Sequence, residues 1–465
     1  MVDAAAQAFD ALLLDVEADD RPDLADRSMW SVTGMKDGGR IAAAIDVLAD
    51  IENRRRPVQD ALKDWGISHR FAGSGDRVAI GNLVFDALRA KASLSYMLDD
   101  ASPRSLALGV YAVSWGKGVE GVATAFEADR HAPPALTDKE TARLEAASLE
   151  GAPDWVRADV PEWLWPEFSA AFGEDAVAEG RALASRAPID MRVNRIKATR
   201  EKVLKRLHHL GAEPTPVSPL GLRIAPAQGA GRMPHVQAEE GFQKGWFELQ
   251  DEASQIVALL AGAKGGDQLL DYCAGGGGKT LALAGEMENR GQIYAYDADR
   301  LRLAPIHERL RRAGVRNVQT RDPQTGGLDG LEGRMDLVFA DVPCSGTGVW
   351  RRRPDSKWRL SERALGDRRA EQREVIRSAS RYVRPGGRLV YVTCSLLGCE
   401  NREQLIGFLD EHRDFKPLDL QAEWIRVLGE TSGRARFDDT GFATLSPARS
   451  GTDGFFVSVL QRADG

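Results

Sequence analysis

The sequence QLLDYCAGGGGKT (residues 268–280) joins a short apolar run to a glycine-rich turn. Gln268 to Tyr272 is predicted to be a strand, and a helix is expected after the glycines. Glycines let the backbone approach a ligand closely, and a helix N-terminus favours a carboxylate or a phosphate. The turn is neither GxGxxG nor a P-loop, because Cys273 stands where a P-loop needs glycine. The turn alone therefore predicts a ligand-binding loop without identifying the ligand.

From residue 246 onward, short apolar strands alternate with longer helical stretches. This alternation predicts an α/β fold, a doubly wound and largely parallel sheet flanked by helices. Ligands of such sheets lie at the carboxyl ends of the strands. The predicted strands are Gln268 to Tyr272, Gln292 to Tyr296, Asn317 to Thr320, Leu337 to Ala340 and Arg388 to Val392.

The first half of the chain has a different pattern. From Arg40 to about Leu98, apolar residues recur at helical spacing, which predicts an all-helical domain ending near residue 130. Residues 130–154 are rich in small and charged residues, which indicates a linker that leads into a further helix. Between 155 and 245 we expect a small α+β segment, with strands at Ile189 to Asn194 and Gly221 to Ile224 and a helix at Thr199 to Leu210.

Composition limits the class of protein. The 465 residues, 43% hydrophobic and 28% charged, suit a globular protein of two to four domains. No apolar run approaches the length of about 18 residues that a membrane span needs, and the N-terminus is acidic, so we expect a cytoplasmic enzyme without a signal peptide. The four cysteines and seven histidines form no disulfide framework or zinc motif, so we expect reduced thiols and no metal.

Net charge is −7, which argues weakly against a nucleic-acid partner. Residues 1–26, however, hold eight acids and one base, so the rest of the chain is close to neutral and locally basic. One basic set lies in the α+β segment and is either a solvated helix face or a contact to RNA phosphates. Its members are Arg192, Arg195, Lys197, Arg200, Lys202, Lys205 and Arg206.

Two cysteines follow predicted strands, Cys344 in DVPCSGTG (341–348) and Cys394 in YVTCS (391–395). Strand ends of one sheet face a common pocket. Methylation of carbon 5 of cytosine is a reaction that needs such a cysteine. A thiolate that adds to carbon 6 turns carbon 5 into a nucleophile, which is covalent catalysis. A lone cysteine is commonly a small buried hydrophobe, but two in polar, glycine- and serine-flanked strand ends favour chemistry. Asp297, at another strand end, is predicted to bind ribose hydroxyls, with a helix cap as the alternative.

These segments resemble the RNA cytosine-5 methyltransferases of the Sun or RsmB type. The resemblance covers nearly all of 245–460 and implies a class I, Rossmann-like S-adenosylmethionine-dependent methyltransferase domain over 246–465. The helical part, 31–135, resembles the NusB-type RNA-binding domain of that family, with Asp76-Arg77 beginning its long central helix. Before it lies an acidic tail, 1–30, and after it the α+β segment, which we expect to bind RNA. The matching segments are Gln250 to Ser254, Lys279-Thr280, Asp297 to Leu303, Asp341 to Gly348, Arg352 to Trp358, Thr393 to Ser395 and Asp453 to Phe456.

The resemblance also implies residue roles. Cys394 would attack carbon 6, and Cys344 would assist release of the product once the carbon-5 proton is lost. Asp341 would hold the polar edge of a flipped cytosine, and Lys279 would reach toward the cofactor or the active site. That the later cysteine is the nucleophile rests on the resemblance alone. The residues expected to bind S-adenosylmethionine are Cys273, Ala274, Gly275, Gly276, Gly277, Gly278, Lys279, Asp297, Arg302, Asp322 and Asp341.

The chain departs from the family in its glycine loop, where Gly275-Gly276 replaces an Ala-Pro pair. Extra glycines raise the entropy of the unfolded loop and loosen it. Cys273 and Cys399 are interpreted as packing residues. The basic run 351–359, interleaved with Trp350 and Trp358, is predicted to hold phosphates and stack bases rather than to form a solvated loop.

The expected substrate is ribosomal RNA of the small subunit, by analogy with the family's NusB-like domain. Transfer RNA is the alternative RNA. There are two alternative functions. One is a noncatalytic RNA-binding or ribosome-assembly factor, and the other is an S-adenosylmethionine enzyme that acts on a small molecule or a protein. We expect a monomer that binds neither a membrane nor a metal.

Overall fold

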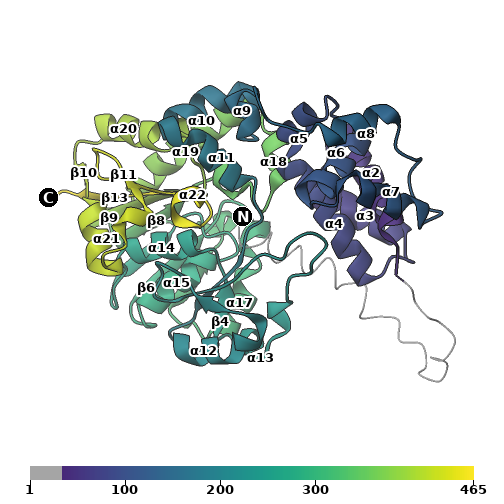
Figure 1. Cartoon of the computed structure of the whole chain (residues 1–465). Helices are drawn as coiled ribbons and strands as arrows, with labels where there is room; N and C mark the ends of the chain where they lie inside the picture. Colours follow the sequence, from purple (N-terminus) through teal and green to yellow (C-terminus); the bar gives the residue numbers. More distant parts are fainter. Residues whose placement is uncertain (1–33, 465) are drawn as a thin grey trace, which may run out of the picture.

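The structure is a computed structural model that describes residues 34–464, so the predicted acidic tail lies outside the described residues. Figure 1 shows a helical lobe, residues 37–145, beside a larger body that contains the sheets. Apolar residues of the lobe such as Ile41, Ile80 and Leu83 are fully buried in one core. The helices of the lobe are α2 (Asp37–Arg54), α3 (Val58–Ser68), α4 (Ser74–Arg89), α5 (Lys91–Met97), α6 (Pro103–Gly109), α7 (Gly118–Glu127) and α8 (Asp138–Glu145).

The helical lobe continues past residue 135. Helix α8 lies within the stretch predicted as a linker, and Thr137 caps it by accepting a hydrogen bond from the backbone N–H of Glu140. Leu144 of α8 packs into the core of the lobe, and Arg104 of α6 pairs with Glu140 at 2.6 Å. The helical core therefore includes residues that the sequence pattern assigned to a connection.

A small antiparallel sheet has the strand order β2-β3-β1-β4. Helix α12 (Arg200–Leu207) covers it, and a short 3-10 turn leads from α12 to Gly211, whose φ of +72° ends the helix. The fourth strand follows residue 245, so this sheet extends beyond the predicted α+β segment. Its strands are β1 (Ile189–Val193), β2 (Glu213–Pro214), β3 (Gly221–Ile224) and β4 (Phe247–Leu249).

The large sheet has the order β11-β12-β13-β9-β8-β5-β6-β7, with β10 paired to β13. Strands β5 to β9 are parallel, and β10 to β13 pair antiparallel, so the predicted doubly wound, largely parallel sheet is confirmed. The strand order reverses at β5, between β6 and β8, and such a switch point is where ligands bind. The strands are β5 (Gln268–Asp271), β6 (Gln292–Tyr296), β7 (Val318–Arg321), β8 (Met335–Asp341), β9 (Val383–Thr393), β10 (Phe415–Pro417), β11 (Arg436–Phe437), β12 (Ala443–Leu445) and β13 (Phe455–Arg462).

Helices cover both faces of the large sheet. Successive side chains of a strand point to opposite faces, so Leu337 and Phe339 of β8 enter one core while Val338 and Ala340 enter another. The helices over the first face are α14 (Glu252–Leu260), α15 (Gly278–Glu286) and α21 (Leu420–Leu428). Those over the second are α19 (Glu362–Ser380) and α20 (Arg402–Glu411). Helix α17 (Ile306–Ala313) packs near the glycine loop, and the short α16 (Arg300–Leu303) and α22 (Pro447–Ser450) complete this part. The short α13 (Glu240–Gln243) packs in the core of the small sheet.

Three further helices lie between the helical lobe and the large sheet in sequence, and the last two of them pack on the loops that carry the cysteines. Phe168 stacks on Trp350 with ring centroids 6.3 Å apart, and both rings share a core with Leu396 and Leu397. This core closes the region behind Cys394 against water. The helices are α9 (Asp154–Arg157), α10 (Trp165–Phe172) and α11 (Ala176–Leu183).

Helix α18 (Pro354–Arg359) joins the helical lobe to the rest of the protein (Figure 1). Trp358 Nε1 donates to the carbonyl oxygen of Leu88 at 2.6 Å, and Lys357 Nζ donates to that of Arg89 at 3.0 Å. The guanidinium of Arg89 in turn donates to the carbonyl oxygen of Arg351 at 2.8 Å. The basic run thus connects two parts of the fold.

The prediction that this run holds phosphates and stacks bases is therefore wrong for its central residues. Trp350 and Lys357 are each 1% exposed, and Arg351 is 4% exposed. Arg351 and Arg352 both pair with the buried Asp453, at 2.9 and 2.5 Å. Internal carboxylates and carbonyls, which sequence spacing does not reveal, compensate these charges.

None of the described helices combines the length and the apolar composition that crossing a bilayer requires.

Candidate active site

Cys344 and Cys394 lie side by side at the carboxyl ends of two neighbouring parallel strands. Asp341 of β8 is in register with Val392 of β9, which brings the two following loops together. The sulfur atoms are 3.3 Å apart, and both cysteines are free. The hydrogen bond from Cys344 lowers the pKa of Cys394, and the same contact raises the pKa of Cys344. The opposite directions of these two pKa shifts favour a thiolate on Cys394 and a thiol on Cys344.

An ion pair connects the glycine-loop helix to the cysteine loops. Lys279 Nζ, in the first turn of α15, donates to Asp341 Oδ2 at 2.7 Å. The ammonium also lies 5.0 Å from the ring centroid of Phe455. Asp341 raises the pKa of Cys394 and Lys279 lowers it, so the two charges of the ion pair act on this pKa in opposite directions. The structure thus brings together all four residues predicted to be catalytic.

The glycine loop has a conformation that glycine suits. Gly275 has φ +50° and Gly277 has φ +83°, both left-handed. The N–H of Gly275 donates to Asp297 Oδ2 at 3.0 Å, and Arg309 donates to the carbonyl oxygen of Gly276 at 2.8 Å. A Cβ on Gly277 would lie only 2.5 Å from Ile306. The glycines that depart from the family pattern are therefore anchored at both positions.

Acidic residues follow the next two strands of the sheet. Asp297, after β6, is 3% exposed, and its Oδ1 accepts a hydrogen bond from the N–H of Asp299 at 2.9 Å. Arg302 lies 3.8 Å from the same oxygen. Asp322, after the edge strand β7, caps a short turn and pairs with Arg300 at 3.3 Å. Asp297 thus belongs to the glycine-loop network, whereas Asp322 lies at the margin of the site.

Asp271, which residue patterns did not single out, lies at the end of β5 under the glycine loop. It is 1% exposed, and Thr280 donates to its Oδ2 at 2.6 Å. Its Oδ1 is buried without a hydrogen-bond partner in the described structure. Burial raises the pKa of Asp271 to about 7. An unsatisfied acidic oxygen at the switch point of the sheet fits the polar group of a ligand.

These features fit S-adenosylmethionine. The left-handed glycines keep the loop free of side chains, and the N-terminus of α15 suits the ligand's carboxylate. Asp271 offers a free oxygen and Asp297 a carboxylate for hydroxyl groups. No group of three or more metal-ligating side chains occurs among residues 34–464.

The two other cysteines have raised thiol pKa values. Burial raises the pKa of Cys273 well above its ordinary value and that of Cys399 to about 12, so both remain protonated near neutral pH. Cys273 lies in the cofactor loop, and Cys399 packs in the core formed by α10 and α11. Neither shares the short sulfur–sulfur contact of Cys344 and Cys394.

Glu400 is a second residue that sequence reasoning missed. It lies in a 3-10 turn after β9 and is 0% exposed. Its carboxylate accepts hydrogen bonds from Ser345 and Ser395, the residues that directly follow the two cysteines. An acid inside the apolar sequence LLGCE (396–400) is unusual, because buried acids need partners, and that signal could have identified it.

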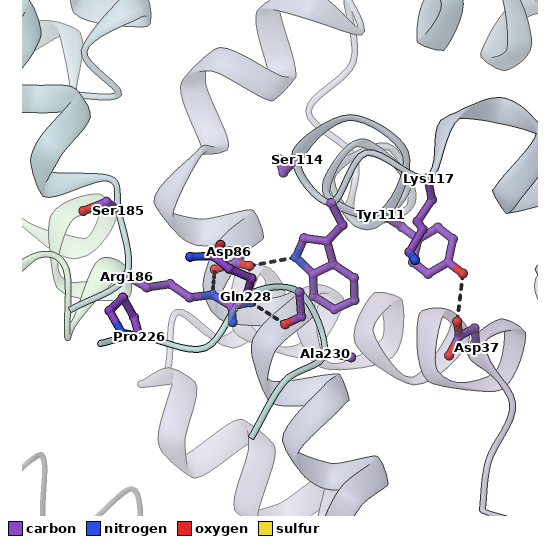
Figure 2. A pocket seen from close by; sticks show the side chains of 12 residues that line it. Asp37, Asp86, Tyr111, Ser114, Lys117, Ser185, Arg186, Pro226, Gln228 and Ala230 are labelled. Carbon is purple, nitrogen blue, oxygen red and sulfur yellow. Dashed lines mark hydrogen bonds and ion pairs between the residues drawn. The ribbon is translucent and has the colours of Figure 1, made fainter. Parts of the chain in front are cut away.

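A separate pocket of about 760 Å³ lies between the helical lobe and the loop 226–230 (Figure 2). Asp86 accepts hydrogen bonds there from Arg186 at 2.5 Å and from Trp115 Nε1 at 2.9 Å. Arg186 also donates to the carbonyl oxygen of Gly229 at 2.7 Å, so the charges in the pocket pair with each other. None of the predicted site residues lines this pocket, which forms a junction between two parts of the fold.

The order of the large sheet, the glycine loop at its switch point and the acid after β6 define an S-adenosylmethionine-dependent methyltransferase. The family model of the 16S rRNA methyltransferase RsmB/F matches residues 258–461, and a model of the ferredoxin-like domain of RsmF/B-like methyltransferases matches 160–229. The chain belongs to this RsmB/F family of methyltransferases, which confirms the family resemblance. Because the two matches begin at residue 160, the NusB-like character of the helical lobe stays a prediction.

Relatives agree with this assignment. The chain is 31% identical to the probable ribosomal RNA small subunit methyltransferase B of Synechocystis sp., over 65% of this chain and 67% of that protein. It is 33% identical to the ribosomal RNA small subunit methyltransferase B of Citrobacter koseri, over 68% and 69%. The crystal structure of PH0851 superimposes with a TM-score of 0.66 at 24% identity, over 91% of this chain and 99% of that one, so the fold is shared along most of the chain.

Proposed function

We propose that the protein methylates carbon 5 of a cytosine in ribosomal RNA of the small subunit. The 3.3 Å contact between Cys344 and Cys394, at adjacent strand ends beside the Lys279–Asp341 pair, carries this proposal. Methylation at an oxygen or nitrogen atom, which is already nucleophilic, would need no cysteine adduct. Both relatives named above are small subunit methyltransferases, which supports the choice of RNA.

Cys394 acts as the nucleophile. Its thiolate adds to carbon 6 of the cytosine, a C–S bond forms, and the electron pair of the 5,6 double bond moves toward carbon 5. S-adenosylmethionine supplies the methyl group that carbon 5 takes up. Loss of the carbon-5 proton to a base then restores the double bond and breaks the C–S bond, which returns Cys394 as a thiolate.

Cys344 assists the release step. Its sulfur lies 3.3 Å from that of Cys394, and its raised pKa keeps it protonated while Cys394 attacks. A thiol at this distance stabilises the departing Cys394 thiolate by donating a hydrogen bond to it.

Asp341 holds the base. Its side chain is 27% exposed, and one of its oxygens is bound by Lys279. A carboxylate in this position accepts a hydrogen bond from the exocyclic amino group of cytosine, as acidic side chains do at this group. Lys279 fixes the carboxylate between the cofactor loop and the thiolate. The base reaches this recessed site only if it is flipped out of its stack or lies in a single strand.

We also propose that helix α12 contacts the RNA backbone. Lys202, Lys205 and Arg206 are exposed on it, and Lys202 Nζ lies 3.8 Å from the ring centroid of Trp246. A basic helix beside an aromatic ring suits a single-stranded segment.

The test is methyl transfer from methyl-labelled S-adenosylmethionine to unmethylated small-subunit ribosomal RNA, with transfer RNA as a parallel substrate. We expect label in 5-methylcytidine of the ribosomal RNA after digestion to nucleosides. Cys394→Ala should abolish incorporation, whereas Cys399→Ala, a matched change of another free cysteine, should retain most of it. Label in another nucleoside would contradict the chemistry, and label only in transfer RNA would contradict the substrate.

A further inference from the structure

Glu400 connects the two cysteine loops. Its Oε1 accepts hydrogen bonds from the N–H of Ser345 at 2.8 Å and from Nε2 of Gln372 at 2.9 Å. Its Oε2 accepts hydrogen bonds from the hydroxyls of Ser345 and Ser395. Ser345 follows Cys344 and Ser395 follows Cys394 in the chain. One buried carboxylate therefore fixes the residues adjacent to both sulfur atoms.

The rest of the network makes this arrangement rigid. Thr347 Oγ1 and Ser395 Oγ are 3.1 Å apart, and the N–H of Gly348 donates to the carbonyl oxygen of Cys394 at 2.9 Å. Tyr391 donates its hydroxyl to the carbonyl oxygen of Glu400 at 2.6 Å, which fixes the turn itself. Networks of this kind hold their members in place when their polar groups have partners, and in the described structure Oε1 of Gln372 is the buried side-chain oxygen of this network that has none.

The four groups that donate hydrogen bonds to the buried Glu400 are neutral, so none of these donors carries a compensating positive charge. An uncompensated charge acts strongly on neighbouring ionisable groups in a medium of low dielectric constant. Two of the four hydrogen bonds to the carboxylate come from Ser345, which follows Cys344, and one comes from Ser395, which follows Cys394.

We propose that Glu400 is a positioning residue that decides which catalytic cysteine holds the proton. Its anion keeps Cys344 as the thiol, and the thiol donates to Cys394, which is left as the thiolate. The inference rests on the proposed function and adds to it a residue that controls which cysteine is protonated. A single proton shared by the two sulfur atoms is assigned to the releasing cysteine before the substrate arrives.

The charges around the pair agree with this assignment. The hydrogen bond with Cys394 raises the pKa of Cys344 most, and burial and the charge of Glu400 raise it further. Asp341 and Lys279 face Cys394 with opposite effects on its pKa, and Arg353 also interacts with its thiolate. The groups on the side of Cys344 are Glu400 and Tyr391, whose own pKa burial raises. Glu400 is the acidic member of this set whose charge raises the pKa of Cys344, so its neutralisation removes that contribution.

The experiment measures alkylation of each cysteine by iodoacetamide in the full-length protein between pH 5.5 and 9, with the modified peptides quantified by mass spectrometry. In the wild type, Cys394 should react faster than Cys344 at pH 7 and with the lower apparent pKa. In Glu400→Gln, the preference for Cys394 should fall about tenfold, the change that a shift of one pKa unit produces. Glu400→Asp, which keeps the charge, should restore most of the preference.

Glu403→Gln is the matched control. Glu403 is an exposed glutamate on α20 that pairs with Arg369 at 3.3 Å, so its neutralisation should leave both alkylation profiles unchanged. Equal loss of preference in Glu400→Gln and Glu400→Asp would reduce Glu400 to a packing role and overturn the proposal. A wild type in which Cys344 reacts faster overturns it too, without depending on any variant. Alkylation needs no RNA, so this outcome is independent of whether cytosine is the methylated base.

Discussion

Asp271 illustrates how the fold sets the protonation of a single side chain. It ends the central strand β5, and only Thr280 donates to it, while its second oxygen has no partner in the described structure. Burial raises its pKa to about 7, from 3.8 for an exposed aspartate. The protein therefore binds a proton at Asp271 that the unfolded chain releases between about pH 4 and 7.

This shift predicts a pH-dependent stability. The folded pKa is raised, so the contribution of Asp271 is fully present below pH 3.8 and is lost as pH rises to about 7. Asp271→Asn imitates the protonated form and cannot lose a proton. The free energy of unfolding of Asp271→Asn minus that of the wild type should therefore be larger at pH 7.5 than at pH 5. Urea titration at the two pH values measures this difference. The same difference at both pH values would show that Asp271 has an ordinary pKa.

Single residues were predictable where they share a strand end with an apolar run. That pattern identified Cys344, Cys394 and Asp297, whereas the role of Asp341 came from the family resemblance. Glu400 was not predicted, because its role depends on two loops, about 50 residues apart in sequence, that converge on one carboxylate. Its serine partners, Ser345 and Ser395, lie 55 and 5 residues before it in the chain.

We propose that the glycine loop acts as an element, with its backbone rather than its side chains forming the cofactor site. Gly277 begins α15 with φ +83°, and a Cβ there would lie 2.5 Å from Cγ1 of Ile306. Gly276, one residue earlier, has no positive φ, and a Cβ there would lie 3.4 Å from the flexible end of Arg309. The two adjacent positions thus differ in whether they tolerate a side chain.

The pair Gly277→Ala and Gly276→Ala tests this difference. Gly277→Ala adds left-handed strain and a clash, which cost about 1 to 3 kcal/mol together, so affinity for S-adenosylmethionine should fall about tenfold or more. Gly276→Ala should change it only a few-fold. Isothermal titration calorimetry measures both. Equal affinities in the two variants would mean that the loop rearranges freely and does not form the site as described.

Among the elements, the parallel strands matched their predictions within a few residues, since each is a short apolar run between helices. Strand β9 is longer than expected, because it begins at Val383 and residues 383–387 precede the apolar run that was predicted as the strand. Helix α8 was missed because its eight residues are mostly polar and only Leu144 is buried. Short polar helices carry little periodic signal, so packing on a neighbouring core decides them.

The whole molecule depends on a buried ion cluster that joins distant segments. Asp453, near the C-terminus, binds Arg351 and Arg352, and Arg352 also reaches Asp251 at 3.1 Å. Three segments of the family resemblance thus meet in one cluster. This is the physical reason why the basic run appeared to be an RNA contact in the sequence: a linear pattern shows the arginines but not the acids 100 residues away that neutralise them.

Removing Asp453 should therefore destabilise the entire chain. Asp453→Asn leaves two buried guanidinium groups with less compensation, a change that costs about 3 to 5 kcal/mol when a buried pair is broken. Asp414→Asn is the control, since Asp414 pairs with Arg462 at the surface and such pairs contribute about 1 kcal/mol or less. Chemical denaturation measures both. Similar losses for the two variants would contradict a central role for the cluster.

The covalent step is the core of the account, and Cys344→Ala tests it most directly. This variant is incubated with small-subunit ribosomal RNA and S-adenosylmethionine, denatured, and analysed on a gel and by peptide mass spectrometry. Attack by Cys394 without assisted release predicts a denaturant-resistant protein–RNA adduct that maps to Cys394 and is absent from the variant that also carries Cys394→Ala. An adduct at any other residue, or methylation of cytosine by Cys394→Ala, would contradict the assigned roles.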